Sequence, residues 1–146
     1  MDLLHFGDYV AGDVYEVGTV EVTEPEIVEF ARKFDPQSFH VDAQLAKSTV
    51  FGGIIASGWH TCAMYMRMFV DALLSRSACL GSPGIEQIRF LRPVRPGDVL
   101  SGRATVLDST PGRRAGRGTV RMHCELLDAA GTTVFTMTAL TIFATR

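Results

Sequence analysis

The spacing of hydrophobic residues predicts two main helices in the first half of the chain. Apolar residues recur three and four positions apart over 24–34, and the letters T-E-P-E at 23–26 form a capping box with a proline in the first turn. Residues 57–75 are apolar on nearly every side, so we expect a longer helix there that is covered on most sides. A proline ends the first helix, and after a loop one more helical turn is expected at 43–47.

Alternating apolar and polar residues predict strands before the first helix and throughout the last third of the chain. One strand is expected within 8–22, and the others at 84–90, 99–108, 118–127 and 133–143. The chain is therefore predicted to have an α+β fold, a single domain over residues 1–146 in which an antiparallel β-sheet wraps around a long central helix. The outer face and the edges of such a sheet need cover, which favours a dimer.

Composition narrows the classes of function. A length of 146 residues suits one domain, and a net charge of −2 gives no general attraction to nucleic acid. The three cysteines are widely spaced, so neither disulfides nor a zinc site is expected, and with no signal peptide apparent we expect a cytoplasmic protein. Arg67 and Asp71 interrupt the apolar run at 54–74, which argues against a membrane span.

Three residues carry candidate chemistry. Asp35 and His40 lie five positions apart just after the first helix, and Gly58 begins the long apolar helix. A carboxylate and an imidazole can move protons, and a helix N-terminus offers N–H donors to an oxyanion. Such groups are needed to add water to a double bond next to a carbonyl, or to remove it. Taken singly, Asp35 could simply end a helix before proline, and His40 could be a structural loop histidine.

Three segments of the chain resemble a known family, the MaoC-like dehydratases, which are relatives of the (R)-specific enoyl-CoA hydratases and have the hotdog fold. The segments read D-P-Q-S-F-H-V-D at 35–42, F-G-G-I-I-A-S-G-W-H-T at 51–61 and F-L-R-P-V-R-P-G-D at 90–98. The resemblance covers roughly residues 8 to 144. It implies reversible hydration of trans-2-enoyl thioesters, on CoA or acyl-carrier protein, to (R)-3-hydroxyacyl thioesters.

The resemblance assigns a role to each candidate. Asp35 would be the base that activates water, His40 would exchange its proton with C2, and the N–H of Gly58 would stabilise the thioester oxygen. Burial and the end of the helix are expected to raise the pKa of Asp35. No metal and no cofactor are expected, because the thioester is itself the substrate. The residues expected to contact it are Phe39, Phe51, Ile55, Ser57 and Trp59.

The chain departs from the hydratase pattern at three positions. Ser38 replaces a proline, Ser57 replaces a histidine before the glycine, and Met66 replaces a serine in the long helix. Two other functions therefore stay open: an acyl-CoA thioesterase of the same fold, and a non-catalytic acyl-CoA-binding or partner subunit. The uncovered face and edges of the predicted sheet lead us to expect a homodimer, whichever function applies.

Several other residues have two interpretations. Asp42 could cap the next helical turn or act as a second acid, and His60 could be an interior histidine or belong to the site. The arginines at 89–95 and at 113–117 could bind a CoA diphosphate or be solvated surface charges.

Overall fold

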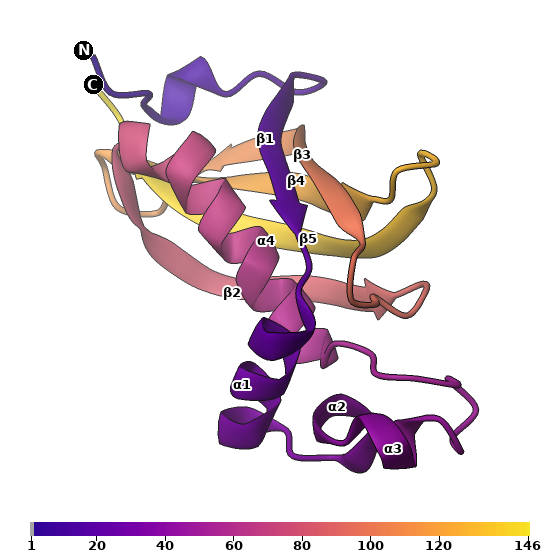
Figure 1. Cartoon of the computed structure of the whole chain (residues 1–146). Coiled ribbons are helices and arrows are strands. Elements are labelled where there is room, and N and C mark those ends of the chain that lie inside the picture. The colour runs from indigo at the N-terminus through magenta and orange to yellow at the C-terminus, as the bar shows by residue number, and fades with distance from the viewer. Residues whose placement is uncertain (1) are drawn as a thin grey trace.

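The computed structural model describes residues 2–146 as one antiparallel sheet curved around a central helix (Figure 1). The strand order is β1-β3-β4-β5-β2, and β2 forms an edge. The strands are β1 (Val14–Glu21), β2 (Cys79–Phe90), β3 (Val99–Pro111), β4 (Arg117–Leu127) and β5 (Thr133–Ala144). The helices are α1 (Glu24–Phe34), α2 (Ser38–Val41), α3 (Ala43–Ala46) and α4 (Gly58–Ala72), with short 3-10 turns at Phe6–Asp8 and Leu74–Arg76.

Most elements lie where the hydrophobic pattern places them, with two corrections. The segment after α1, expected to be a loop, contains the single turn α2. Strand β2 begins at Cys79, earlier than the expected start at Gly84, and its pairing with β5 shifts register three times. Ser82 and Pro83 lie within it, and the Ser82 hydroxyl donates to the Leu140 carbonyl at 2.5 Å. An irregular edge strand of this kind lacks the alternation that sequence reasoning uses.

The inner face of the sheet and one side of α4 form the core. Along β4 the side chains alternate as predicted: Val120, Met122, Cys124 and Leu126 are fully buried, while Thr119, Arg121 and His123 remain partly exposed. On α4 the buried side includes Tyr65 and Phe69. This packing holds the helix, and with it the helix N-terminus, in a fixed place against the sheet.

The opposite side of α4 is not covered within the chain, so the expectation of a helix covered on most sides is wrong for the single chain. Trp59 is 63% exposed, and Met66 and Val70 are each 38% exposed. This uncovered apolar surface continues onto the edge strand β2, where Leu80 and Ile85 are exposed.

The outer face of the sheet, by contrast, is polar and needs no partner. Arg103 pairs with Glu125 at 2.5 Å, and Arg121 pairs with both Asp108 and Glu86. The argument for a partner therefore rests on the β2 edge and on α4 rather than on the outer face.

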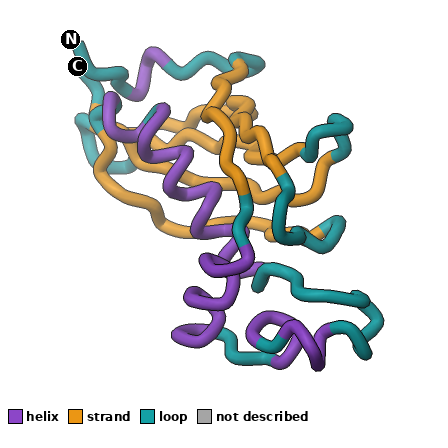
Figure 2. The backbone as a smooth tube through the Cα atoms, in the orientation of Figure 1, coloured by secondary structure: helices purple, strands orange, loops and turns teal. Residues whose placement is uncertain are grey.

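Helices α1, α2 and α3 and the loop that leads into α4 form a lobe beyond one end of the sheet (Figures 1 and 2). Thr23 caps α1 by accepting from the N–H of Glu26, as the capping box predicts. Two backbone bonds fix the loop: the N–H of Ile55 donates to the Phe39 carbonyl at 3.0 Å, and that of Ala56 to the Val94 carbonyl at 2.8 Å. No helix within residues 2–146 combines the length and apolar character that crossing a membrane requires.

Candidate active site

Asp35 and His40 meet because a short turn folds the chain back on itself after α1. Asp35 is the C-terminal cap of α1, and His40 lies in the single turn of α2. Their side chains approach to 3.3 Å between Asp35 Oδ2 and His40 Nε2. The His40 side chain is 5% exposed and that of Asp35 is 19% exposed. The two groups singled out by sequence spacing thus form one shielded acid–base pair.

A backbone carbonyl determines which nitrogen of His40 faces the carboxylate. His40 Nδ1 lies 2.7 Å from the carbonyl oxygen of Ile55. A carbonyl only accepts hydrogen bonds, so we assign the hydrogen on Nδ1 from this contact. Nε2 is then the nitrogen that faces the Asp35 carboxylate and can exchange protons.

Two hydrogen-bond donors and the His40 ring surround the carboxylate of Asp35. Gln37 Nε2 donates to Oδ1 at 2.7 Å, and the Ser57 hydroxyl donates to Oδ2 at 2.7 Å, beside His40. Desolvation raises the pKa of Asp35, but these two hydrogen bonds and the neighbouring His40 outweigh it, so the pKa lies below its ordinary value. The expected rise in this pKa is therefore wrong, because the hydrogen-bond donors were not visible in the sequence. Asp35 is ionised near neutral pH, as a base must be.

Gly58 begins α4, and its N–H is free to bind a ligand. Ser57 caps the helix by accepting from the N–H of Trp59 at 3.3 Å. Among residues 2–146, the Gly58 N–H has no acceptor. A Cβ at this position would lie 2.5 Å from the ring of Phe90. The glycine therefore allows a close approach at the N-terminus of α4, where the helix dipole favours negative charge.

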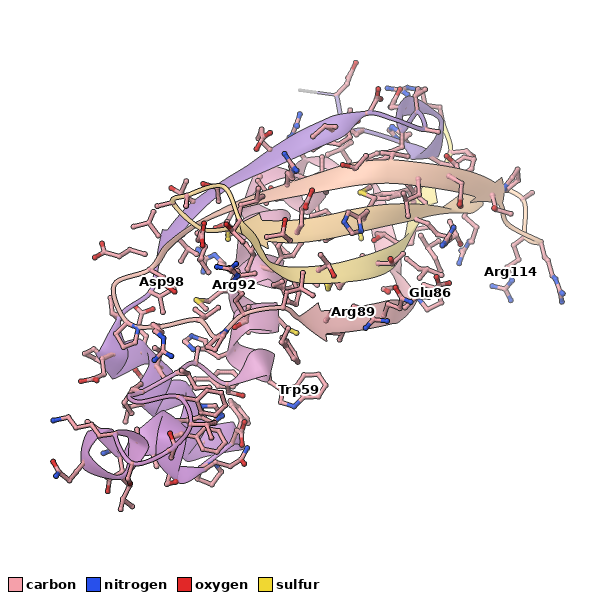
Figure 3. All side chains as sticks on the ribbon, turned by 90° about the vertical axis from the view of Figure 1, so that its right-hand side faces the viewer. Trp59, Glu86, Arg89, Arg92, Asp98 and Arg114 are labelled. Atoms are coloured by element: carbon pink, nitrogen blue, oxygen red, sulfur yellow. The ribbon has the colours of Figure 1, made fainter. Side chains whose placement is uncertain are left out.

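A cavity of about 390 Å³ lies between His40 and the N-terminus of α4. His40 and Gly58 both line it, together with three of the predicted substrate contacts, Phe51, Ile55 and Trp59. Figure 3 shows Trp59 projecting from the first turn of α4. The remaining wall comes from Ala56 and Thr61 and from Phe90, Leu91, Arg92, Pro93, Val94 and Val134. The cavity is mostly apolar, with few polar groups, as is typical of small-molecule sites.

The other predicted site residues lie behind the cavity wall. Asp35 is not part of the wall but contacts His40, which is. Phe39 packs its ring against those of His40 and Phe51, with centroids 4.5 and 5.2 Å apart. Ser57 is fully buried and binds Asp35. Substrate contact by Phe39 and Ser57 stays a prediction, and their contacts in this chain instead orient the acid–base pair.

The residues with two interpretations can now be placed. Asp42 caps α3 by accepting from the N–H groups of Gln44 and Leu45. His60 is buried and stacks on Phe30 at 4.9 Å, outside the cavity wall. Within residues 2–146 no cluster of three or more His, Cys, Asp or Glu side chains could hold a metal ion.

The three departures from the hydratase pattern lie in different places. Ser38 begins α2, and Ser57 holds Asp35. Met66 does not line the cavity; it lines a separate groove between α4 and β2. The basic tip at 113–117 joins β3 to β4, and Figure 3 shows its Arg114 far from Trp59 within the chain.

Sequence reasoning missed two residues of this site. Gln37 orients Asp35 through a hydrogen bond. In the sequence, the only indication of this role is that Gln37 lies two residues after Asp35. Phe90 covers Gly58 from a strand more than thirty residues away in the sequence, and no local pattern indicates that contact.

Comparison with known proteins places these features in a wider group. The sequence model described as "MaoC like domain" matches residues 7–125. The uncharacterized protein YdeM of Bacillus subtilis is 32% identical over 106 residues, which are 73% of this chain and 75% of that protein. The crystal structure of a MaoC-like dehydratase from Rhodospirillum rubrum aligns with a TM-score of 0.90 and 36% identity, covering 98% of both chains.

A hydratase is also among the similar structures. The (R)-hydratase PhaJ1 from Pseudomonas aeruginosa, in its unliganded form, aligns with a TM-score of 0.78 and 26% identity, covering 99% of this chain and 87% of that one. These alignments confirm the hotdog fold that the sequence resemblance implied.

Proposed function

Because this chain belongs to the family of MaoC-like domains, we propose that it is a hydro-lyase that adds water to trans-2-enoyl thioesters, giving (R)-3-hydroxyacyl thioesters, and catalyses the reverse dehydration. The observation that carries the proposal is the acid–base pair of Asp35 and His40, in contact at 3.3 Å, with His40 in the wall of the cavity that Gly58 also lines. The carrier is CoA or acyl-carrier protein, and no cofactor takes part in the proposed reaction.

In the first proposed step, Asp35 removes a proton from water while the water oxygen bonds to C3 of the enoyl group. The hydrogen bonds from Gln37 and Ser57 keep Asp35 ionised and turned toward His40. They also reduce its basicity, so the proton transfer depends on close positioning rather than on a raised pKa.

The second proposed step completes the addition. His40 donates the proton on Nε2 to C2, and its Nδ1 keeps the bond to the Ile55 carbonyl. Asp35 now holds the proton from water, and His40 lacks one. Transfer from Oδ2 to Nε2 across the 3.3 Å contact restores both groups, so protons balance over one turnover.

The developing negative charge on the thioester oxygen would be stabilised by the N–H of Gly58. That donor lies at the N-terminus of α4, and one side of this helix packs into the core. Loss of one such donor typically lowers the rate by about 10²–10³. Met66 lies outside the cavity wall, so the serine missing at this position does not alter the cavity of the single chain.

We also propose that the chain is a homodimer joined through the edge strand β2 and the uncovered side of α4. Residues of β2 are exposed along nearly its whole length, and an apolar groove of about 200 Å³ runs between α4 and β2. Pairing of two β2 edges would satisfy their free backbone groups and cover this apolar surface. Analytical ultracentrifugation tests this, and a monomer at micromolar concentration would contradict it.

The enzyme assay uses crotonyl-CoA and follows the loss of enoyl absorbance, with chiral analysis of the 3-hydroxybutyryl product. Wild-type protein should give the (R)-product, and Asp35→Asn and His40→Ala should each lower kcat by about 10²–10⁴. Activity that survives unchanged in both variants would reject the mechanism. Release of free thiol without 3-hydroxy product would instead indicate a thioesterase, and binding without turnover a non-catalytic subunit.

The proposed compartment is the cytoplasm. Cys62, Cys79 and Cys124 are all unpaired thiols, which fits a reducing environment.

A further inference from the structure

One cationic side chain in the cavity wall has no role in the chemistry above. Arg92 lies in the loop after β2 and lines the cavity together with His40 and Gly58. No aspartate or glutamate lines the cavity in the part of the chain described, so nothing in its wall neutralises this charge. The nearest acid in the site, Asp35, lies behind His40 and is held by its own donors.

Within residues 2–146, Arg92 is the only arginine that lines the cavity, and it forms no ion pair there. Arg67, Arg103, Arg121 and Arg146 each form an ion pair with a carboxylate. Within residues 2–146, no carboxylate lies within 4.0 Å of the Arg92 guanidinium. Its five N–H donors are therefore available to a ligand, in a geometry that suits phosphate or carboxylate.

Two further arginines share this end of β2. Arg89 is the second-last residue of β2, and Arg95 lies in the loop that follows. Neither forms an ion pair within the chain described. Figure 3 shows Arg89 and Arg92 on the same side of the molecule as Trp59. Of these three arginines only Arg92 lines the cavity, so it is the one placed to contact a bound anion. An anion approaching this end would be attracted to it.

The backbone that carries Arg92 is held firmly. The N–H groups of Leu91 and Arg92 both donate to the Val134 carbonyl, at 2.9 and 3.3 Å. Two residues later the Val94 carbonyl accepts from the N–H of Ala56, which ties this loop to the segment leading into α4. Prolines at 93 and 96 restrict the backbone further. Binding would therefore order only the Arg92 side chain, which lowers the entropic cost.

We infer that Arg92 binds an anionic group of the thioester substrate and so helps to select it. This rests on the proposed function, because the ligand is the thioester that His40 and Asp35 act on. Two parts of such a substrate can carry the anion. One is the phosphate at the far end of the pantetheine arm, and the other is a carboxylate at the far end of the acyl group.

The test compares Arg92→Ala and Arg92→Lys with a matched control, Arg32→Ala. Arg32 is an exposed arginine on α1 that also lacks an ion pair and does not line the cavity. Three substrates separate the sources of the anion: crotonyl-CoA carries phosphates, crotonyl-pantetheine carries no charge, and glutaconyl-pantetheine carries only an acyl carboxylate.

We expect Arg92→Ala to lower kcat/KM about 10–100-fold on at least one anionic substrate, mainly through KM, and to leave crotonyl-pantetheine unchanged. Arg92→Lys should lose less, because it keeps the charge without the two-pronged contact. A loss on crotonyl-CoA alone identifies the phosphate, and a loss on glutaconyl-pantetheine alone identifies the carboxylate. High salt should shrink the effect.

Equal losses on all three substrates would overturn the inference, since Arg92 would then support the fold or the cavity shape. No loss on any substrate would overturn it as well. Hydration of uncharged crotonyl-pantetheine by the wild type keeps these outcomes apart from a failure of the proposed function.

A binding measurement needs no turnover. Trp59 is the only tryptophan in the sequence and lines the cavity, so its fluorescence can report binding of saturated thioesters. Butyryl-CoA or glutaryl-pantetheine should bind the wild type about 10–100-fold more tightly than Arg92→Ala, and butyryl-pantetheine should bind both alike. Equal affinities of the two proteins for both anionic esters would overturn the inference even if no hydratase activity were found.

Discussion

The inner face of the sheet and the segment from Asp35 to Gly58 bury their side chains in different ways. The inner face of the sheet buries mainly apolar groups, as at Val120, Met122 and Leu126, with Thr141 as a polar exception. The segment buries His40 and Ser57, which are polar, and satisfies them through bonds to Ile55 and Asp35.

The difference separates stability from chemistry. An apolar core depends on filled volume, so its substitutions act mainly on the free energy of unfolding. A network of buried polar groups depends on each partner being present, and it also determines which atoms carry protons. Substitutions in the two regions should therefore change different measured quantities, and four experiments examine this.

The largest effect on stability should come from Phe143→Ala. Phe143 is fully buried and stacks on Tyr9 with ring centroids 4.4 Å apart. Its loss should lower the free energy of unfolding by about 3–5 kcal/mol, because a cavity replaces the ring. Denaturant unfolding measures this, with Thr138→Ala on the outward side of β5 as the control. A fall in kcat of the folded protein would show that core and site are not separate.

Gly58→Ala should lower kcat about 10–100-fold with a smaller loss of stability. The new methyl group would lie 2.5 Å from the Phe90 ring and at the proposed thioester position. The double variant Gly58→Ala/Phe90→Ala distinguishes the two causes. If the glycine serves thioester binding, kcat stays low in the double variant, whereas recovery of kcat would mean that the glycine only makes room for Phe90.

Ser57→Ala should shift the pH dependence of the reaction. Without the Ser57 hydroxyl, the pKa of Asp35 rises toward its ordinary value, so the acidic limb of the kcat/KM profile moves to higher pH. The variant also loses a helix cap, worth about 1 kcal/mol.

Thr23→Ala is the matched control, because it removes the cap of α1 and touches no group of the site. It should cost similar stability and leave the pH profile unchanged. If both variants shift the profile alike, the hydroxyl of Ser57 has no specific effect on Asp35.

The smallest effect concerns His60. Burial lowers the pKa of His60, with Glu26 opposing the shift. The unfolded chain therefore binds a proton at His60 near pH 6.5, whereas the folded chain binds it only at lower pH. The free energy of unfolding that is present above this pH therefore decreases as the pH falls. His60→Leu should weaken this dependence between about pH 7.5 and 5.5. Urea unfolding at several pH values measures this. If the free energy of unfolding falls with pH as steeply in the variant as in the wild type, His60 is not responsible.

Local pattern predicted most of the fold because each element carries its own signal. The caps at Thr23 and Ser57 and the alternation along β4 depend only on residues near in sequence. Strand β2 was mislocated at its start because Pro83 and the register shifts remove that signal. The exposed side of α4 was also missed, since an apolar helix looks the same in sequence whether its own chain or another one covers it.

Within the site, spacing brought Asp35, His40 and Gly58 together as candidates, but it misjudged the pKa of Asp35. The direction depends on Gln37 and Ser57, whose side chains could have pointed elsewhere. Arg92 was recognised only as an ambiguous charge, because a position in the cavity wall cannot be read from its neighbours.

Periodicity and spacing act along the chain, so they were enough to indicate the kinds of element, their order and the residues able to move protons. Packing between elements sets which carboxylate oxygen meets which nitrogen, which donors lower the pKa of Asp35 and which arginine lines the cavity. Those properties depend on distances of a few ångströms between residues from different elements, and such distances exist only once the elements have packed.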